Sequence, residues 1–516
     1  MKLYSENENY KLYNGNMLDM LDVIKPNSID SIVTDPPYGL TSITKRFGKE
    51  NSAPAQYGKD GAFGRLSKGF MGKEWDGSGI EYNIETWEKC YEVLKPGGYL
   101  LAFGGSRTYH RIACAIEDAG FEIRDTICWI YGSGFPKSMN IGKGLDAKLK
   151  YGKAGTSYKR EIEQSCEGET HIIKQTNNGA MGEIIETTRK DYKPFTDEAN
   201  EWNGWGTCLK PSFEPIIVAR KPFKGSLVDN VLTYGVGGLN IDECRIGTNK
   251  SDLDKLNREW DREWNSSYND YANNVGGKAG FDYSKSRTEN KKLTGRFPAN
   301  TILTYDESDY EEVCGGFPNT KSTKSKNDNR INKHKSMFID GVHNESNSYN
   351  DSGSASRYFY CAKASKRDRD EGLEQFEAKQ KYYCDGRANS LEIFGSTDGG
   401  RKPLKNIHPT VKPTSLMSYL VRLVTPNGGT ILDPFNGSGS TGKAVMYENK
   451  DHNKNYKYIG IELTEEYLPI AKARIEYVCN LEEEQADSQM TIFDYLDDNK
   501  LKWETRTIWF VIVLFL

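Results

Sequence analysis

The chain has 516 residues, of which 36% are hydrophobic and 28% are charged, and its formal net charge is -4. This length is sufficient for several domains of ordinary size, or for one large domain that carries insertions. The slightly acidic charge excludes a surface that is basic throughout, so any contact with nucleic acid must come from local patches.

The first strongly apolar segment, residues 29–33, leads directly into Asp35, Pro36, Pro37 and Tyr38. Two consecutive prolines remove backbone donors and fix the chain, so the carbonyl groups here stay free to accept hydrogen bonds. Together with the carboxylate of Asp35 and the ring of Tyr38, this segment can hold a planar group that carries an amine. A nucleobase that has been flipped out of DNA has that shape.

The segments that follow predict an α/β fold. Residues 84–94 have helical periodicity, residues 99–103 and 123–131 are predicted strands, and a helix that ends at Ala119 connects them. Strands that alternate with helices are typical of a mostly parallel sheet. Ligands of such sheets bind at the carboxyl ends of the strands, which is where Asp35 lies.

The next part of the chain leaves the sheet and is predicted to return to it. Residues 136–210 form a mostly polar insertion. Residues 211–223 are predicted to rejoin the sheet as an edge strand, because Pro215 and Pro222 bracket the apolar run.

Residues 224–405 have no long helical period and are rich in Gly, Asn, Ser, Lys and aromatic residues. This composition indicates either an inserted recognition region or partial disorder. Two basic runs lie within it, at 321–335 and 363–369. Charge runs are usually solvated loops, but in a chain that also has a base-binding site they are a second candidate surface for phosphate groups.

Near the C-terminus, a strand, a glycine loop and the start of a helix follow one another. Gly437, Gly439 and Gly442 satisfy the pattern G-x-G-x-x-G, and Glu462 lies 20 residues further on, after the predicted strand 458–461. In a βαβ unit this arrangement places backbone amides near the ligand and an acid on ribose hydroxyls. The pattern therefore indicates a cofactor that contains a nucleoside.

Three cofactors can be weighed for this loop. A nucleoside triphosphate is disfavoured, since Lys443 is followed by Ala444 and not by the Ser or Thr that would hold magnesium. A dinucleotide fits the glycines but leaves the segment from Asp35 to Tyr38 without a role. S-adenosylmethionine accounts for both features, because its methyl group must face a neighbouring acceptor site.

Five motifs occur in order along the chain, at Asp35–Tyr38, Trp129–Ser138, His408–Pro413, Asp433–Gly442 and Ile459–Tyr467. Their order resembles the amino-methylating DNA methyltransferases of the N6-adenine/N4-cytosine family, in the arrangement where the D-P-P-Y motif precedes the cofactor motif. The likeness covers residues from about 12 to 480 and is greatest to a phage or prophage branch.

This resemblance implies a Rossmann-like S-adenosylmethionine-dependent methyltransferase fold. We expect a mostly parallel seven-stranded sheet with one antiparallel strand, and an inserted target-recognition region at 224–405. Residues 1–135 would form the catalytic half, residues 406–480 the cofactor-binding half, and residues 481–516 a tail.

The resemblance also implies roles for individual residues. Asp35 and the Pro36 carbonyl would accept the two hydrogens of the target amine beside Pro37, and Tyr38 would stack on the flipped base. Where the family usually has Gly-Asp this chain has Gly15 and Asn16, so Asp19 is a further candidate for the same contact. The predicted cofactor-binding residues are Asn16, Asp19, His408, Thr410, Lys412, Asp433, Phe435, Gly437, Ser438, Gly439, Thr441 and Glu462.

The implied function is site-specific methylation of double-stranded DNA, with a place in restriction-modification. The base would be flipped out, and the methyl group of S-adenosylmethionine would pass to its amine by direct in-line attack without a metal. Asp35 favours the N6 amine of adenine, since cytosine-modifying relatives often have Ser there. The N4 amine of cytosine, an RNA or protein methyltransferase, and a non-catalytic DNA-binding protein with the same fold stay as alternatives.

The two ends of the chain add weaker signals. Gln489–Phe493 resembles the peptide by which bacterial DNA enzymes bind the sliding clamp, although an acidic tail with two apolar residues is the simpler interpretation. The N-terminus lacks an apolar signal segment, and the apolar run 508–516 is far shorter than the ~20 residues of a membrane span. We therefore expect a bacterial or phage-encoded protein of the cytoplasm without a membrane partner.

Overall fold

The computed structural model describes most of the chain from residue 2 to residue 481. The described residues are 2–38, 79–131, 138–152, 170–176, 184–190, 192–248, 292–305, 319–321, 352–354, 359–363, 366–378 and 405–481, with a few positions between 250 and 257.

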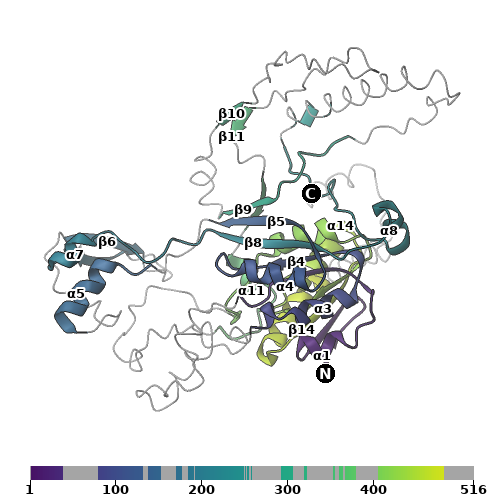
Figure 1. Cartoon of the computed structure of the whole chain (residues 1–516), viewed down its shortest axis with the longest axis horizontal. Helices are drawn as coiled ribbons and strands as arrows, with labels where there is room; N and C mark the ends of the chain where they lie inside the picture. Colours follow the sequence, from purple (N-terminus) through teal and green to yellow (C-terminus); the bar gives the residue numbers. More distant parts are fainter. Residues whose placement is uncertain are drawn as a thin grey trace, which may run out of the picture.

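Within these residues, one ten-stranded mixed sheet forms the centre of the fold (Figure 1). The strand order is β1-β2-β14-β13-β3-β4-β8-β5-β9-β12. The strands are β1 (Lys2–Glu6), β2 (Tyr10–Asn14), β3 (Ile29–Thr34), β4 (Leu94–Phe103), β5 (Glu122–Tyr131), β8 (Phe213–Arg220), β9 (Thr301–Tyr305), β12 (Tyr360–Lys363), β13 (Thr430–Asp433) and β14 (Lys457–Glu462).

The predicted α/β class with a mostly parallel sheet is confirmed. The seven strands from β2 to β5 include one strand, β8, that runs antiparallel to both of its neighbours. The sheet is larger than the predicted seven strands, because β1 extends one edge and β9 and β12 extend the other.

Helices cover both faces of the sheet and make a three-layer structure. Because side chains alternate along a strand, Ile32 and Leu100 pack toward one hydrophobic layer and Val33 and Leu101 toward the other. The first layer contains α1 (Met17–Leu21), α3 (Ile84–Val93) and α4 (Tyr109–Asp118). The second contains α13 (Thr414–Val424), α14 (Ser440–His452) and the helix at 468–481.

A small unit stands apart from the sheet, at the left of Figure 1. It consists of α5 (Ile141–Tyr151), the antiparallel pair β6 (Thr170–Thr176) and β7 (Ile184–Lys190), and α7 (Asp197–Glu201). The buried carboxylate of Asp146 on α5 accepts hydrogen bonds from the hydroxyls of Tyr192 and Thr196, each at 2.6 Å. These bonds fasten α5 to the chain that leads into α7.

The expectation of an edge strand at 211–223 was wrong. β8 lies in the interior of the sheet, between β4 and β5. Pro215 removes only a backbone donor, while its carbonyl still accepts a hydrogen bond from the Gly104 amide at 2.9 Å. A proline near the start of a strand is therefore compatible with an interior position.

Part of the predicted insertion 224–405 belongs to the sheet, because it contributes β9 and β12. It also contains α8 (Leu227–Tyr234), α11 (Lys366–Asp370) and a separate two-stranded sheet of β10 (Asn319–Lys321) and β11 (Ser352–Ser354). The basic run 321–335 and the terminal segments 489–493 and 508–516 lie almost entirely outside the described residues. In the described part of the chain, no helix is both long and apolar enough to cross a membrane.

The buried lysine Lys221, directly after β8, connects this strand to the junction between α3 and β4. The ammonium of Lys221 donates to the carbonyls of Tyr91 at 2.6 Å and Leu94 at 2.8 Å, and to the Asn27 side chain at 2.9 Å. Burial lowers the pKa of Lys221. The three acceptors therefore stabilise an ammonium that has lost its water.

We predict that Lys221→Met lowers the free energy of unfolding by about 2 to 4 kcal/mol, because buried carbonyls lose a charged donor. Lys457→Met is the matched control, since the Lys457 ammonium makes an exposed contact with the Glu8 carbonyl. The control should change stability by less than ~0.5 kcal/mol. Urea unfolding of both variants checks this, and equal losses in the two would contradict the role of Lys221.

Candidate active site

A pocket of about 1170 Å³ opens at the carboxyl ends of β3, β13 and β14. β3 pairs directly with β13, so the segments that follow them, from Asp35 and from Pro434, leave the sheet side by side. Glu462 lies at the end of β14 and lines the same pocket. The two halves of the predicted site, about 400 residues apart in the chain, thus meet at one edge of the sheet.

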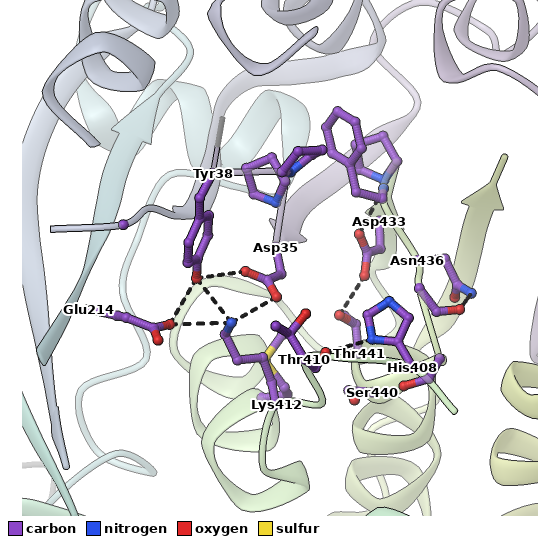
Figure 2. A pocket seen from close by; sticks show the side chains of 18 of the residues that line it. Asp35, Tyr38, Glu214, His408, Thr410, Lys412, Asp433, Asn436, Ser440 and Thr441 are labelled. Carbon is purple, nitrogen blue, oxygen red and sulfur yellow. Dashed lines mark hydrogen bonds and ion pairs between the residues drawn. The ribbon is translucent and has the colours of Figure 1, made fainter. Parts of the chain in front are cut away.

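Four ionisable side chains form a cluster on the β3 side of the pocket (Figure 2). The ammonium of Lys412 lies 2.8 Å from Asp35 Oδ2, 3.0 Å from the Tyr38 hydroxyl and 3.3 Å from Glu214 Oε2. The Tyr38 hydroxyl is 2.9 Å from Asp35 Oδ1 and 2.8 Å from Glu214 Oε2, so its single proton serves one carboxylate at a time. One oxygen of Asp35 therefore accepts from Lys412, and the other lies within hydrogen-bond distance of the Tyr38 hydroxyl.

Burial and mutual charge set the protonation of this cluster. Burial raises the pKa of Asp35, and the ammonium of Lys412 acts against that rise. Burial alone would lower the pKa of Lys412, but Asp35 and Glu214 raise it above its ordinary value. Lys412 is consequently charged at neutral pH, and Tyr38, whose pKa is raised by burial and by both carboxylates, is neutral.

The backbone of the D-P-P-Y segment is held from the α3 and α4 side. The Tyr38 carbonyl accepts hydrogen bonds from the Tyr82 hydroxyl at 2.9 Å and from the Thr108 hydroxyl at 2.8 Å. Pro36 and Pro37 line the pocket beside it. Because the prolines fix φ and these hydroxyls fix the following carbonyl, the segment presents Asp35 in one arrangement.

A second group of residues surrounds the glycine loop. Glu462 accepts hydrogen bonds from the amides of Gly437 and Thr464, each at 2.7 Å, and burial raises its pKa to about 7. Gly437 has φ +52°, and a Cβ there would lie 2.9 Å from His408 Nε2. The loop therefore requires glycine at 437, and its backbone approaches the pocket without a side chain.

His408 is itself fixed in place. Its Nδ1 is 2.7 Å from the Thr410 carbonyl, and its ring meets the Tyr467 ring edge to face, with centroids 4.6 Å apart. The H-P-T segment before α13 is thus positioned against the loop after β13. Both segments line the pocket.

Asp433 connects the two sides of the site. Its carboxylate accepts hydrogen bonds from the hydroxyls of Thr34 and Thr441, each at 2.6 Å, and from the Phe435 amide at 3.1 Å. Burial raises the pKa of Asp433 to about 6, although these three donors favour its ionised form. The strand end before Asp35 and the first turn of α14 are therefore anchored on one carboxylate.

Most of the predicted site residues are brought together in this pocket. Those that line it are Asn16, Asp35, Pro36, Pro37, Tyr38, His408, Thr410, Lys412, Asp433, Phe435, Gly437, Ser438, Thr441 and Glu462. Asp19 lies in α1 and is not among the lining residues. Gly439 is not among them either: it precedes α14 with φ +74°, and a Cβ there would lie 3.0 Å from Ala471. Lys412, predicted to approach the cofactor, contacts Asp35.

The sequence analysis missed two residues that contact the site, Glu214 and Arg474. The sequence did contain a signal for Glu214, because an acidic residue next to Pro215 at the start of an apolar strand is unusual. Arg474 offered no signal, since arginines on helices are usually exposed. Its buried guanidinium donates to the Ser438 carbonyl at 2.8 Å and to the hydroxyls of Ser438 and Ser440, each at 3.1 Å. Arg474 therefore stabilises the glycine loop from the helix at 468–481.

Comparison with known proteins gives a match over most of the chain. The model of the N6_N4_Mtase family, described as DNA methylase, matches residues 29–473. The Type II methyltransferase M.HindIII of Haemophilus influenzae is 26% identical over 248 residues, which cover 44% of this chain and 64% of that protein. M.HpaI of Haemophilus parainfluenzae is 26% identical over 259 residues, 49% of this chain and 74% of the relative. The M.HindIII match thus spans less than two thirds of that relative.

Comparison with solved structures also gave matches. The PvuII DNA methyltransferase, described as cytosine-N4-specific, covers 93% of this chain and 94% of its own, with 11% identity and a TM-score of 0.35. The M1.HpyAVI-SAM complex covers 90% and 99%, with 13% identity and a TM-score of 0.30.

We predict that Arg474→Met lowers the free energy of unfolding by about 2 to 4 kcal/mol, because three buried oxygens around the glycine loop lose their donor. Lys472→Met, two residues earlier in the same helix and exposed, should have an effect below ~0.5 kcal/mol. Thermal and urea unfolding check both variants. A stable Arg474→Met protein would show that the loop does not depend on this guanidinium.

Proposed function

This chain belongs to the N6/N4 DNA methylase family, and from that premise we propose that it methylates the N6 amine of adenine in DNA with S-adenosylmethionine. The observation that carries the proposal is the single pocket in which the Asp35 cluster faces the glycine loop and Glu462. A methyl donor on the loop side and an amine on the Asp35 side would then lie in the same pocket. Double-stranded DNA is the proposed partner, and the cytoplasm of a bacterium the proposed compartment.

The residues of the loop side fit S-adenosylmethionine. Glu462 is a buried carboxylate with unused lone pairs for ribose hydroxyls, since each oxygen accepts one amide hydrogen bond. Gly437 allows the close backbone approach that an adenosine group needs, and the ring of Phe435 lines the same space. We therefore assign Glu462, Gly437, Phe435 and the nearby Asn16 to the cofactor.

When bound, S-adenosylmethionine supplies an electrophilic methyl group. The amine of adenine is conjugated to its ring and is a poor nucleophile, so the chain must orient its nitrogen. Asp35 and the Pro36 carbonyl accept the amine hydrogens, which directs the nitrogen lone pair away from them, and Tyr38 contacts the flat base. The cluster of Asp35, Glu214 and Lys412 holds two carboxylates and one ammonium. The carboxylate of Asp35 favours positive charge on the attacking nitrogen.

The choice of adenine rests on Asp35. A cytosine amine fits the same acceptors, so methylation of cytosine N4 is the alternative. Type II methyltransferases among the relatives support a role in restriction-modification. Contact with a sliding clamp through Gln489–Phe493 stays a prediction.

The first test is the reaction itself. Unmethylated plasmid DNA incubated with the protein and labelled S-adenosylmethionine should yield labelled N6-methyladenine, and single-molecule sequencing should give the recognition site. Asp35→Ala should lower the transfer rate by ~1000-fold or more, because an essential oriented acceptor is lost. Calorimetry should show cofactor affinity changed by less than about threefold. Label on cytosine would favour the alternative, and unlabelled DNA would refute the proposed function.

Cofactor binding should depend on pH through Glu462. Its pKa of about 7 means that the carboxylate is ionised above that pH and protonated below it. We expect affinity for S-adenosylmethionine to fall as the pH drops from about 8 to about 6, because a protonated carboxyl loses acceptor capacity toward ribose. Titration calorimetry across this range measures the effect.

Glu462→Gln should bind the cofactor about tenfold more weakly at pH 8 and should lose most of the pH dependence. Glu465→Gln is the control variant, because Glu465 is an exposed acid three residues further on, outside the pocket lining, and should leave the step near pH 7 in place. A pH dependence that persists in Glu462→Gln would assign it to another group.

A further inference from the structure

The side chain of Lys412 is buried in surroundings that packing alone does not explain. Its side chain is 8% exposed, and its ammonium lies between the carboxylates of Asp35 and Glu214. The rings of Phe103, Tyr38 and Trp129 also surround it, at 4.9, 5.2 and 5.9 Å from ammonium to centroid. Aromatic rings at such distances stabilise a buried cation.

The ammonium occupies the acceptor that the proposed reaction requires. Asp35 Oδ2 accepts from Lys412 at 2.8 Å, and Oδ1 is 2.9 Å from the Tyr38 hydroxyl (Figure 2). A target amine that donates to Asp35 would therefore compete with a nitrogen that already donates there. Removing an ammonium from a buried carboxylate is unfavourable unless the ammonium keeps another anion.

Glu214 is that second anion. Its Oε2 is 3.3 Å from the Lys412 ammonium, and its Oε1 accepts from the Tyr131 hydroxyl at 3.3 Å. Glu214 stands on β8, in the interior of the sheet, so it is fixed while the four-carbon stem of Lys412 can rotate. A small movement of the ammonium toward Glu214 would leave Asp35 free without leaving the charge of Lys412 unpaired.

We propose that Lys412 holds the place of the target amine when no base is bound, and that its ammonium moves onto Glu214 when the amine reaches Asp35. This inference rests on the proposed function and deepens it. Glu214 is then a positioning residue that acts through Lys412. The arrangement selects for bases that carry an amine, because only a hydrogen-bond donor can replace the ammonium at Asp35.

The test compares Glu214→Gln in two backgrounds, the wild-type chain and Lys412→Met, on a duplex that contains the recognition site found by sequencing. In the Glu214→Gln single variant, where Lys412 is present, the ammonium has no second anion and stays on Asp35. We expect kcat/KM for DNA to fall about thirtyfold, mainly through KM. In the Lys412→Met background no ammonium has to move, so Glu214→Gln should change kcat/KM by less than about threefold.

Two further measurements separate this role from a purely structural one. Without cofactor, and at a pH above the acid limb of the Lys412→Met profile, fluorescence anisotropy should show that Lys412→Met binds the duplex at least about threefold more tightly than wild type, and Glu214→Gln more weakly. In Lys412→Met the acid limb of the kcat/KM profile should move to higher pH, since the ammonium that opposes protonation of Asp35 is gone. Glu122→Gln, an exposed acid on β5, is the control for both measurements.

Cofactor affinity and thermal unfolding show whether each variant is folded. If Glu214→Gln does not fold, Glu214→Asp tests the same step, with a smaller loss that must again disappear in Lys412→Met. A Glu214→Gln loss of equal size in both backgrounds overturns this inference alone. Absence of methyl transfer by the wild-type chain overturns the proposed function, and this inference with it.

Discussion

The geometry of the whole site depends on the buried carboxylate of Asp433. Thr34 donates to it from the end of β3, one residue before Asp35, and Thr441 donates to it from the first turn of α14. Without these two bonds, parallel pairing of β3 with β13 would bring the segments together but would not fix the angle at which each leaves the sheet. An acid at 2% exposure is unfavourable by itself, and three donors within 3.1 Å offset that cost.

A second set of buried charges connects α11 to the helices α13 and α14. Asp368 in α11 accepts from the Lys443 ammonium at 2.6 Å and from the Thr414 amide, at the start of α13, at 2.7 Å. Lys443 and Arg474 have no exposed side-chain surface. The loop bound by Arg474 and the helix α11 are therefore joined through one group of buried charges.

The parts of the structure that could be predicted are those encoded locally. The D-P-P-Y segment, the glycine loop and the alternation of strands and helices are short patterns, and parallel strands necessarily end at one edge of a sheet. The position of β8 could not be predicted, because it depends on pairing with β4 and β5 across the chain, and Pro215 pointed to an edge. Glu214 was missed for the same reason: its role exists only once β8 lies beside the pocket. Lys412 was assigned to the cofactor because the family resemblance gives that role to the whole segment from His408 to Lys412.

The position of Lys412 resolves a conflict between burial and ionisation. Asp35 must be ionised to accept an amine, yet burial raises its pKa, and a second carboxylate at Glu214 raises it further. Two carboxylates alone in this pocket would favour a shared proton, which would convert an acceptor into a donor. The ammonium between them opposes that protonation. The group that we propose to occupy Asp35 at rest thus also favours the ionised form of Asp35, and both effects follow from one buried charge.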